Sequence, residues 1–117
     1  MKLALLTAAL ALISSNAFAA NADFVLVNKT GYDINEVYIS PSNKQNWGDD
    51  RLGDYQFEKN QSINMKFGDT NNCQQDIKVV FSDDGTEIEW EDFNLCEINK
   101  ITLKYNKNSG EVSAEFE

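Results

Sequence analysis

The feature that most constrains this fold is a pair of neighbouring segments with strict two-residue periodicity. Apolar and polar residues alternate along residues 75–82 and again along residues 87–93. The turn-forming sequence Asp83-Asp84-Gly85-Thr86 lies between the two segments. Alternation around such a turn predicts a β-hairpin. Opposed residues must share a face, so a four-residue turn over residues 83–86 places Val79 opposite Trp90.

The same pairing explains the positions of the only two cysteines. Continued to the far end of the hairpin, it places Cys73 opposite Cys96. Opposed strand residues have Cα atoms about 4.5–5.5 Å apart, a distance that a disulfide spans. A zinc site would need more ligands of the right kind. We therefore expect a Cys73–Cys96 disulfide, which should stabilise the fold by about 3 kcal/mol.

The rest of the chain after residue 22 also reads as strands. Further segments with strand-like alternation are residues 23–28, 32–40, 61–67, 100–106 and 111–117. In the last two, Ile101, Leu103 and Tyr105 oppose Phe116, Ala114 and Val112 across a turn over residues 107–110. About seven short antiparallel strands in one domain predict a small β-sandwich, with a small closed β-barrel as the alternative.

The N-terminus has the three parts of an export signal. Lys2 is a positive start, residues 3–13 are apolar, and Ala17-Phe18-Ala19 fits the small-x-small cleavage rule. The apolar run is too short to span a bilayer, which takes about 20 residues. We expect a signal peptide over residues 1–19, a single domain over residues 20–117, and no membrane span in the mature protein. Cleavage after Ala22 is the alternative.

The charge of the chain excludes several functions. The protein has 10 basic and 19 acidic residues and no histidine. A strongly acidic chain lacks the basic surface that nucleic acid or anionic lipid requires. The absence of histidine removes the commonest general base and the commonest neutral metal ligand. We expect a periplasmic or secreted protein that is not an enzyme. A small hydrolase acting through paired carboxylates is the weakest alternative.

A long polar segment between the second and third predicted strands holds the candidate site. Its acidic residues Asp49, Asp50 and Asp54 are weak calcium-ligand candidates, although the EF-hand pattern is absent. The alternative is that the aspartates cap backbone N–H groups while Arg51 pairs with one of them. No other cofactor is expected.

Aromatic residues divide into two groups. Four are in phase with the predicted core: Phe81, Trp90, Tyr105 and Phe116. Trp47, Tyr55 and Phe57 fall outside any alternation, and if they lie on one surface they would form an aromatic patch of the kind that anchors a protein or a glycan.

Several segments resemble a family of small bacterial exported β-proteins. The most specific are the loop WGDDRLG (residues 47–53) and the segment NLCEI (residues 94–98), and the others are residues 24–31, 37–42, 101–103 and 109–117. The resemblance covers nearly the whole chain after the signal peptide. It implies export and a β fold but no catalytic residue. Members often carry the label argininosuccinate lyase. We interpret that label as a misannotation, because such a lyase is a large, mostly helical tetramer.

These observations favour an exported interaction module of unknown ligand. Functional loops are commonly held on rigid sandwiches. We therefore expect contact with a protein or glycan of the cell envelope through residues 46–57. Trp47 and Tyr55 would be the anchors, and Asp49, Asp50 and Arg51 would give polar specificity. A calcium- or carbohydrate-binding module using the same loop is the alternative, and the oligomeric state stays open.

Overall fold

The structure, a computed structural model, describes residues 20–117, which form nine strands and no helix. The predicted signal peptide lies outside these residues. The strands are β1 (Ala20–Asn21), β2 (Phe24–Lys29), β3 (Ile34–Pro41), β4 (Ser62–Met65), β5 (Asp69–Thr70), β6 (Gln74–Phe81), β7 (Glu87–Asn94), β8 (Lys100–Asn106) and β9 (Glu111–Phe116). Residues 20–117 contain no helix long and apolar enough to cross a membrane.

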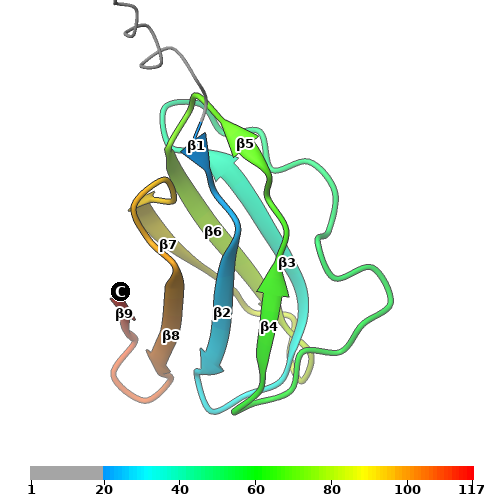
Figure 1. Ribbon diagram of the computed structural model, residues 1–117. Coiled ribbons are helices and arrows are strands. Elements are labelled where there is room, and N and C mark those ends of the chain that lie inside the picture. Colours follow the sequence, from blue (N-terminus) through cyan, green and yellow to red (C-terminus); the bar gives the residue numbers. More distant parts are fainter. Residues whose placement is uncertain (1–19) are drawn as a thin grey trace, which may run out of the picture.

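Two sheets pack face to face (Figure 1). One has the order β4-β2-β8-β9 and the other the order β3-β6-β7, while β1 and β5 form a separate short pair. All pairings are antiparallel except that of β2 with β8, which is parallel. The predicted all-β sandwich is confirmed. The alternative of a closed barrel is wrong, because the strands of residues 20–117 divide into open sheets.

The core lies between the inner faces of the two sheets. Ile77 and Val79 of β6 and Ile101 and Leu103 of β8 are fully buried. Their positions follow the two-residue period that the sequence shows, since successive strand residues point to opposite faces. The predicted inward phase of β6 and β8 is therefore confirmed.

The first hairpin has a different register from the predicted one. Val79 pairs with Ile88, and Ile77 rather than Val79 pairs with Trp90. The cause is the turn, in which Gly85 takes the last position with φ 72°. This left-handed conformation suits glycine, so the turn covers residues 82–85 instead of 83–86. A shift of one turn residue moves the pairing by two residues and keeps the same side chains on the inner face.

The disulfide between Cys73 and Cys96 is confirmed, with Cα atoms 5.3 Å apart. The two cysteines are not directly opposed, because the backbone N–H of Leu95 donates to the carbonyl of Cys73 (2.9 Å). A β-bulge interrupts the ladder opposite Asp76, where the N–H of Asp92 donates to the Asp76 carboxylate (2.9 Å). The bulge offsets part of the register change and leaves the cysteines close enough to bond.

The second hairpin has the predicted register. Ile101 pairs with Phe116 and Tyr105 pairs with Val112. Gly110 is the last residue of its four-residue turn and has φ 77°, like Gly85 in the first hairpin. Both turns therefore follow one rule, in which the glycine takes the left-handed position just before the returning strand.

Three of the four aromatic residues predicted in the core are buried or half-buried, and one is not. Phe81 and Trp90 are buried and Tyr105 is half-buried, but 61% of Phe116 is exposed. Phe116 lies on β9, the end strand of the four-stranded sheet. The three-stranded sheet does not fully cover the inner face of β9, so Phe116 stays exposed although it has the inward phase.

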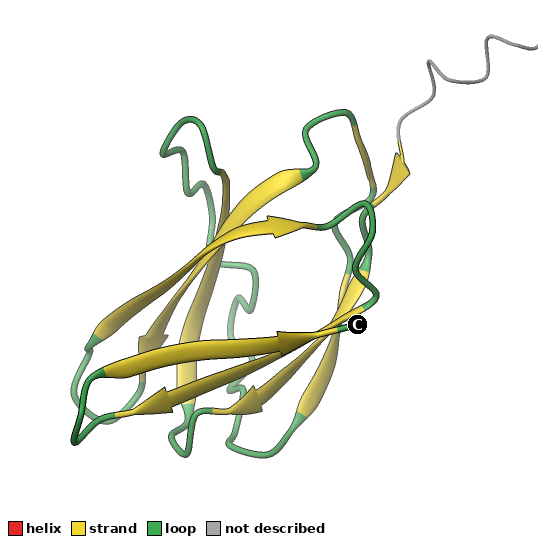
Figure 2. Cartoon of the chain, turned by 90° about the vertical axis from the view of Figure 1, so that its left-hand side faces the viewer, coloured by secondary structure: helices red, strands yellow, loops and turns green. Residues whose placement is uncertain are grey.

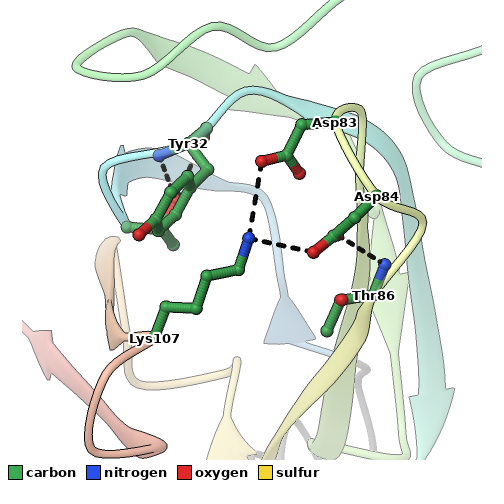
Figure 3. A network of polar contacts seen from close by, with 6 residues as sticks. Tyr32, Asp83, Asp84, Thr86 and Lys107 are labelled. Carbon is green, nitrogen blue, oxygen red and sulfur yellow. Dashed lines mark hydrogen bonds and ion pairs between the residues drawn. The ribbon is translucent and has the colours of Figure 1, made fainter.

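A lysine joins the turns of the two hairpins across the sheets (Figure 3). The Nζ atom of Lys107 lies 2.9 Å from the Asp84 carboxylate and 3.4 Å from the Asp83 carboxylate. It also lies 4.6 Å from the centroid of the Tyr32 ring. The hydrogen bond from Lys107, followed by the one from the Thr86 N–H, lowers the pKa of Asp84. These contacts fix the two turns relative to each other.

We predict that this contact makes stability depend on pH in acid. The pKa of Asp84 in the folded protein lies below its ordinary value of 3.8, so the stabilisation is complete above pH 3.8 and is lost as the pH falls further. Replacing Lys107 with methionine should lower the free energy of unfolding at neutral pH by a small amount, because the pair is exposed. The difference from wild type should shrink below pH 3.8, as measured by denaturant titration at each pH. Lys44→Met, at an exposed lysine with no ion pair among residues 20–117, is the control, and a pH-independent difference would contradict the prediction.

Candidate functional site

A hollow of about 500 Å³ lies beside the long segment between β3 and β4. We call it the loop hollow. Its walls are the end of β3, the first part of the long segment, and the stretch from β4 to β6. The lining residues are Ile39, Pro41, residues 46–51, Phe67, Thr70, Asn72 and Gln75.

The first wall is fixed to the free edge of β3. The Asp50 carboxylate accepts hydrogen bonds from the backbone N–H groups of Val37 (2.9 Å) and Leu52 (3.0 Å). The N–H of Arg51 donates to the Val37 carbonyl (2.7 Å). Asp50 therefore caps backbone N–H groups, as one of the sequence interpretations predicted. These hydrogen bonds hold the loop against the edge of β3.

The opposite wall is held by a second aspartate. The Asp23 carboxylate accepts hydrogen bonds from the N–H groups of Gly68 (2.6 Å) and Phe67 (2.8 Å). The Gly68 N–H makes the largest contribution to lowering the pKa of Asp23, because it stabilises the charged carboxylate. Phe67 is thereby kept in place beside the hollow.

Trp47 is oriented by a lysine on the outer face of the three-stranded sheet. The Nζ atom of Lys78 lies 4.9 Å from the Trp47 ring centroid and 5.1 Å from the Tyr38 ring centroid. Tyr38 donates a hydrogen bond to Glu36 (2.5 Å), and this bond raises the pKa of Tyr38 to about 12. The cation–π contacts hold the half-buried indole at the rim of the hollow.

Arg51 lies over an aromatic ring instead of pairing with a loop carboxylate. Its guanidinium carbon is 4.9 Å from the Phe67 ring centroid, and it makes no ion pair with any carboxylate of residues 20–117. The predicted pairing of Arg51 with an aspartate is wrong, because Asp50 is used by the backbone. The exposed guanidinium keeps hydrogen-bond donors available for an external acceptor.

Gln75 is a residue of the hollow that sequence reasoning missed, as is Phe67. Gln75 is 2% exposed, and its Nε2 donates to the Asn72 carbonyl (2.7 Å). Its Oε1 is buried and accepts no hydrogen bond from any residue of the described chain. A buried acceptor without a partner costs about 1–3 kcal/mol. The sequence did contain an indication of this site, because Gln75 is a polar residue at an inward, odd-numbered position of β6.

The three aspartates considered as calcium ligands do not form a cluster. No group of three or more histidine, cysteine, aspartate or glutamate side chains within residues 20–117 could hold a metal ion. Asp49 and Asp50 line the loop hollow, whereas Asp54 does not. Because Asp50 already binds two backbone N–H groups, the arrangement does not suit a cation.

The three loop aromatics do not form one patch. Trp47 lines the hollow, but Phe57 is fully buried in the core. Tyr55 is 47% exposed, lies outside the hollow lining, and donates a hydrogen bond to Gln61 (3.2 Å). The condition for an aromatic patch, that the three residues lie on one surface, is therefore not met, and the second aromatic residue of the loop hollow is Phe67.

The loop hollow presents groups suited to non-covalent binding. Trp47 offers a flat apolar surface, Arg51 offers charged donors and Gln75 offers a buried acceptor. These groups lie on walls that Asp23 and Asp50 fix through backbone hydrogen bonds. Compared with protein families, curated proteins and solved structures, the chain shows no significant match.

Proposed function

We propose that the protein is a non-catalytic binding module that holds a segment of a partner protein in the loop hollow. The observation that carries the proposal is the buried Oε1 of Gln75, which has no donor within the described chain. Gln75 lines the hollow, so a small movement of its side chain on binding would bring this acceptor to a donor of the ligand and recover the cost. The backbone hydrogen bonds of Asp23 and Asp50 would keep the rest of the site in place.

The chemistry of the hollow suits a polypeptide. Main-chain N–H groups of a partner would donate to Gln75, its carbonyl or carboxylate groups would accept from Arg51, and an apolar side chain would pack on Trp47. A glycan also supplies hydroxyl donors and a flat ring face, and it is the competing ligand. Calcium is left out of the proposal because the loop carboxylates do not gather.

We predict that Gln75→Met weakens partner binding without destabilising the protein. Methionine matches the length of glutamine and removes the unpaired acceptor, while the freed Asn72 carbonyl belongs to an exposed residue and can bind water. The free energy of unfolding should stay within about 0.5 kcal/mol of wild type or rise by about 1 kcal/mol. Binding should fall by at least about tenfold. Denaturant titration and calorimetry with the partner measure the two effects.

Affinity capture from an extract of the producing cells supplies the partner for this test. The tagged wild-type protein and a Gln74→Met control, changed at the exposed neighbouring position, should retain the partner. Trp47→Ala and Gln75→Met should lose it. A partner retained equally by all four proteins would show that the loop hollow is not the site. Loss of the partner after glycosidase treatment of the extract would show that the ligand is a glycan.

We also propose that residues 1–19 direct export and are then removed. The disulfide is consistent with an oxidising compartment. Cleavage after Ala19 would keep β1, whose Ala20 and Asn21 pair with β5. Cleavage after Ala22 would remove β1 together with a fully buried alanine. The structure of the N-terminal strand thus supports the first cleavage site over the second.

We predict that the mature protein begins at Ala20. Intact-mass measurement of the protein purified from the producing cell should give the mass of residues 20–117, less two hydrogens for the disulfide. A protein that retains residues 1–19 would contradict both the signal peptide and the proposed location. A protein that begins at Asp23 would show that β1 is dispensable.

A further inference from the structure

One face of β9 has side chains that alternate toward the core, but the rest of the protein does not fully cover them. Val112, Ala114 and Phe116 point to the same side as their pairing partners on β8, of which two are buried and one is half-buried. Val112 is nevertheless 38% exposed and Phe116 is 61% exposed. β9 is the end strand of a four-stranded sheet, and the facing sheet has three strands. That sheet ends at β7, which touches β9 through Trp90 and Phe93 but does not fully cover Val112 and Phe116.

The uncovered face forms a groove with the edge of β7. We call it the edge groove. It has a volume of about 410 Å³ and is lined by Glu89, Trp90, Glu91, Phe93, Val112, Ala114 and Phe116. Its two sides are tied together, since the indole N–H of Trp90 donates to the Ser113 carbonyl (2.7 Å). The rings of Phe93 and Phe116 also meet edge to face at 6.1 Å. The groove is therefore built into the sandwich.

Other segments of the described chain hydrogen-bond to the free edge of β3, one end strand of the three-stranded sheet, but not to the free edge of β7, the other end strand. The free edge of β3 is covered, because the backbone of Val37 binds Arg51 and Asp50, and that of Ile34 binds Phe57. No residue of the described chain hydrogen-bonds to the outer backbone edge of β7 between Glu87 and Glu91. Figure 2 views the molecule from the side on which β7, β8 and β9 lie, where this edge faces the viewer. An open strand edge is a template for another strand.

The open edge is acidic on its outer side. Glu87, Glu89 and Glu91 alternate along β7 with the inward residues Ile88 and Trp90. Only Glu87 has an ion-pair partner among residues 20–117, and that contact is long (4.0 Å, to Lys78). A strand added beside β7 would therefore meet an apolar face on its inner side and unpaired carboxylates on its outer side.

We infer that the edge groove binds an extended segment of a partner protein in which apolar residues alternate with lysine or arginine. The segment would add a strand to β7, with its apolar side chains covering Val112 and Phe116 and its cationic side chains facing Glu89 and Glu91. A second copy of the chain pairing β7 with β7 would oppose two acidic rows, which is unfavourable. This site is separate from the loop hollow, which lies beside the opposite end strand, β3.

The test uses the purified protein and a synthetic peptide of alternating valine and lysine as long as β7, which has 8 residues. We expect calorimetry at low salt to detect binding, with affinity falling as salt is added. Amide hydrogens of β7 that point away from β6 should exchange more slowly in the complex. The same peptide with N-methylated residues cannot form a strand ladder and should bind at least about tenfold more weakly. A peptide of alternating valine and glutamate should not bind.

Two variants of equal charge distinguish the groove from general acidity. Glu89→Lys with Glu91→Lys should weaken binding by about tenfold or more. Glu58→Lys with Glu97→Lys changes two exposed glutamates outside the groove and should leave binding within about twofold of wild type. Equal binding of the plain and N-methylated peptides, or equal weakening by both variants, would overturn the proposal. The proposal would also be overturned if sedimentation detected a dimer and the Glu89 and Glu91 changes altered it, because the occupant of the groove would then be a second copy of the chain.

Discussion

Replacing Phe57 with alanine is expected to lower the free energy of unfolding by about 3–5 kcal/mol, the usual cost of removing a buried phenylalanine side chain. Phe57 is fully buried although it lies in the long irregular segment between β3 and β4. Its backbone exchanges two hydrogen bonds with Ile34 (2.8 and 3.0 Å), and its carbonyl accepts another from the Asn28 amide (3.2 Å). The ring therefore anchors the segment that carries the loop hollow. Denaturant unfolding at neutral pH measures the effect.

Tyr55→Ala is the matched control, because this aromatic residue lies two positions away and is 47% exposed. It should cost less than about 1 kcal/mol, as surface changes usually do. Phe57→Leu should cost clearly less than Phe57→Ala, since leucine fills most of the space. If Phe57→Ala and Tyr55→Ala cost the same, the anchoring role of Phe57 would be refuted.

Removing the disulfide should lower the free energy of unfolding by about 3 kcal/mol, because the bond closes a loop in the unfolded chain. Cys73 and Cys96 are 23 residues apart in the sequence and are bonded in the folded protein. The variant to measure replaces both cysteines with alanine, so that no free thiol remains. Chemical denaturation of the oxidised wild type gives the reference.

A reducing agent supplies the control for this prediction. It should lower the stability of the wild type to about that of the double-alanine variant and leave the variant unchanged. A reductant that destabilised both proteins equally would point to another effect. An equal stability of oxidised wild type and variant would mean that the bulged end of the hairpin is already ordered without the bond.

The two hairpins show how far local sequence reasoning reaches. The register of β8 with β9 follows from a four-residue turn that ends in Gly110. The register of β6 with β7 was predicted wrongly because the turn was started one residue late, although Gly85 takes the same last position. The bulge opposite Asp76 depends on a carboxylate that binds Asp92 and Ser42. Since Ser42 is distant in the sequence, no local pattern could indicate it.

The candidate site was predicted in part. The sequence singled out the loop containing Trp47, Asp49 and Arg51 as an interaction surface, and the structure places these three residues in the lining of the loop hollow. Tyr55 and Asp54 do not belong to it, and Phe67 and Gln75 come from segments that the prediction left out. An irregular loop has no period, so its side chains cannot be assigned to a face from the sequence.

The sequence by itself determined the β class, the strand phases, the inward faces of β6 and β8, and the cysteine pair. These properties depend on residues close together in the chain, where turn chemistry and the two-residue period act directly. Only the tertiary structure decided the parallel pairing of β2 with β8, the burial of Phe57 and the unequal sheets that expose Phe116. These features arise from contacts between distant segments, whose free energy depends on how two whole sheets meet. The loop hollow and the edge groove both result from such contacts between distant segments.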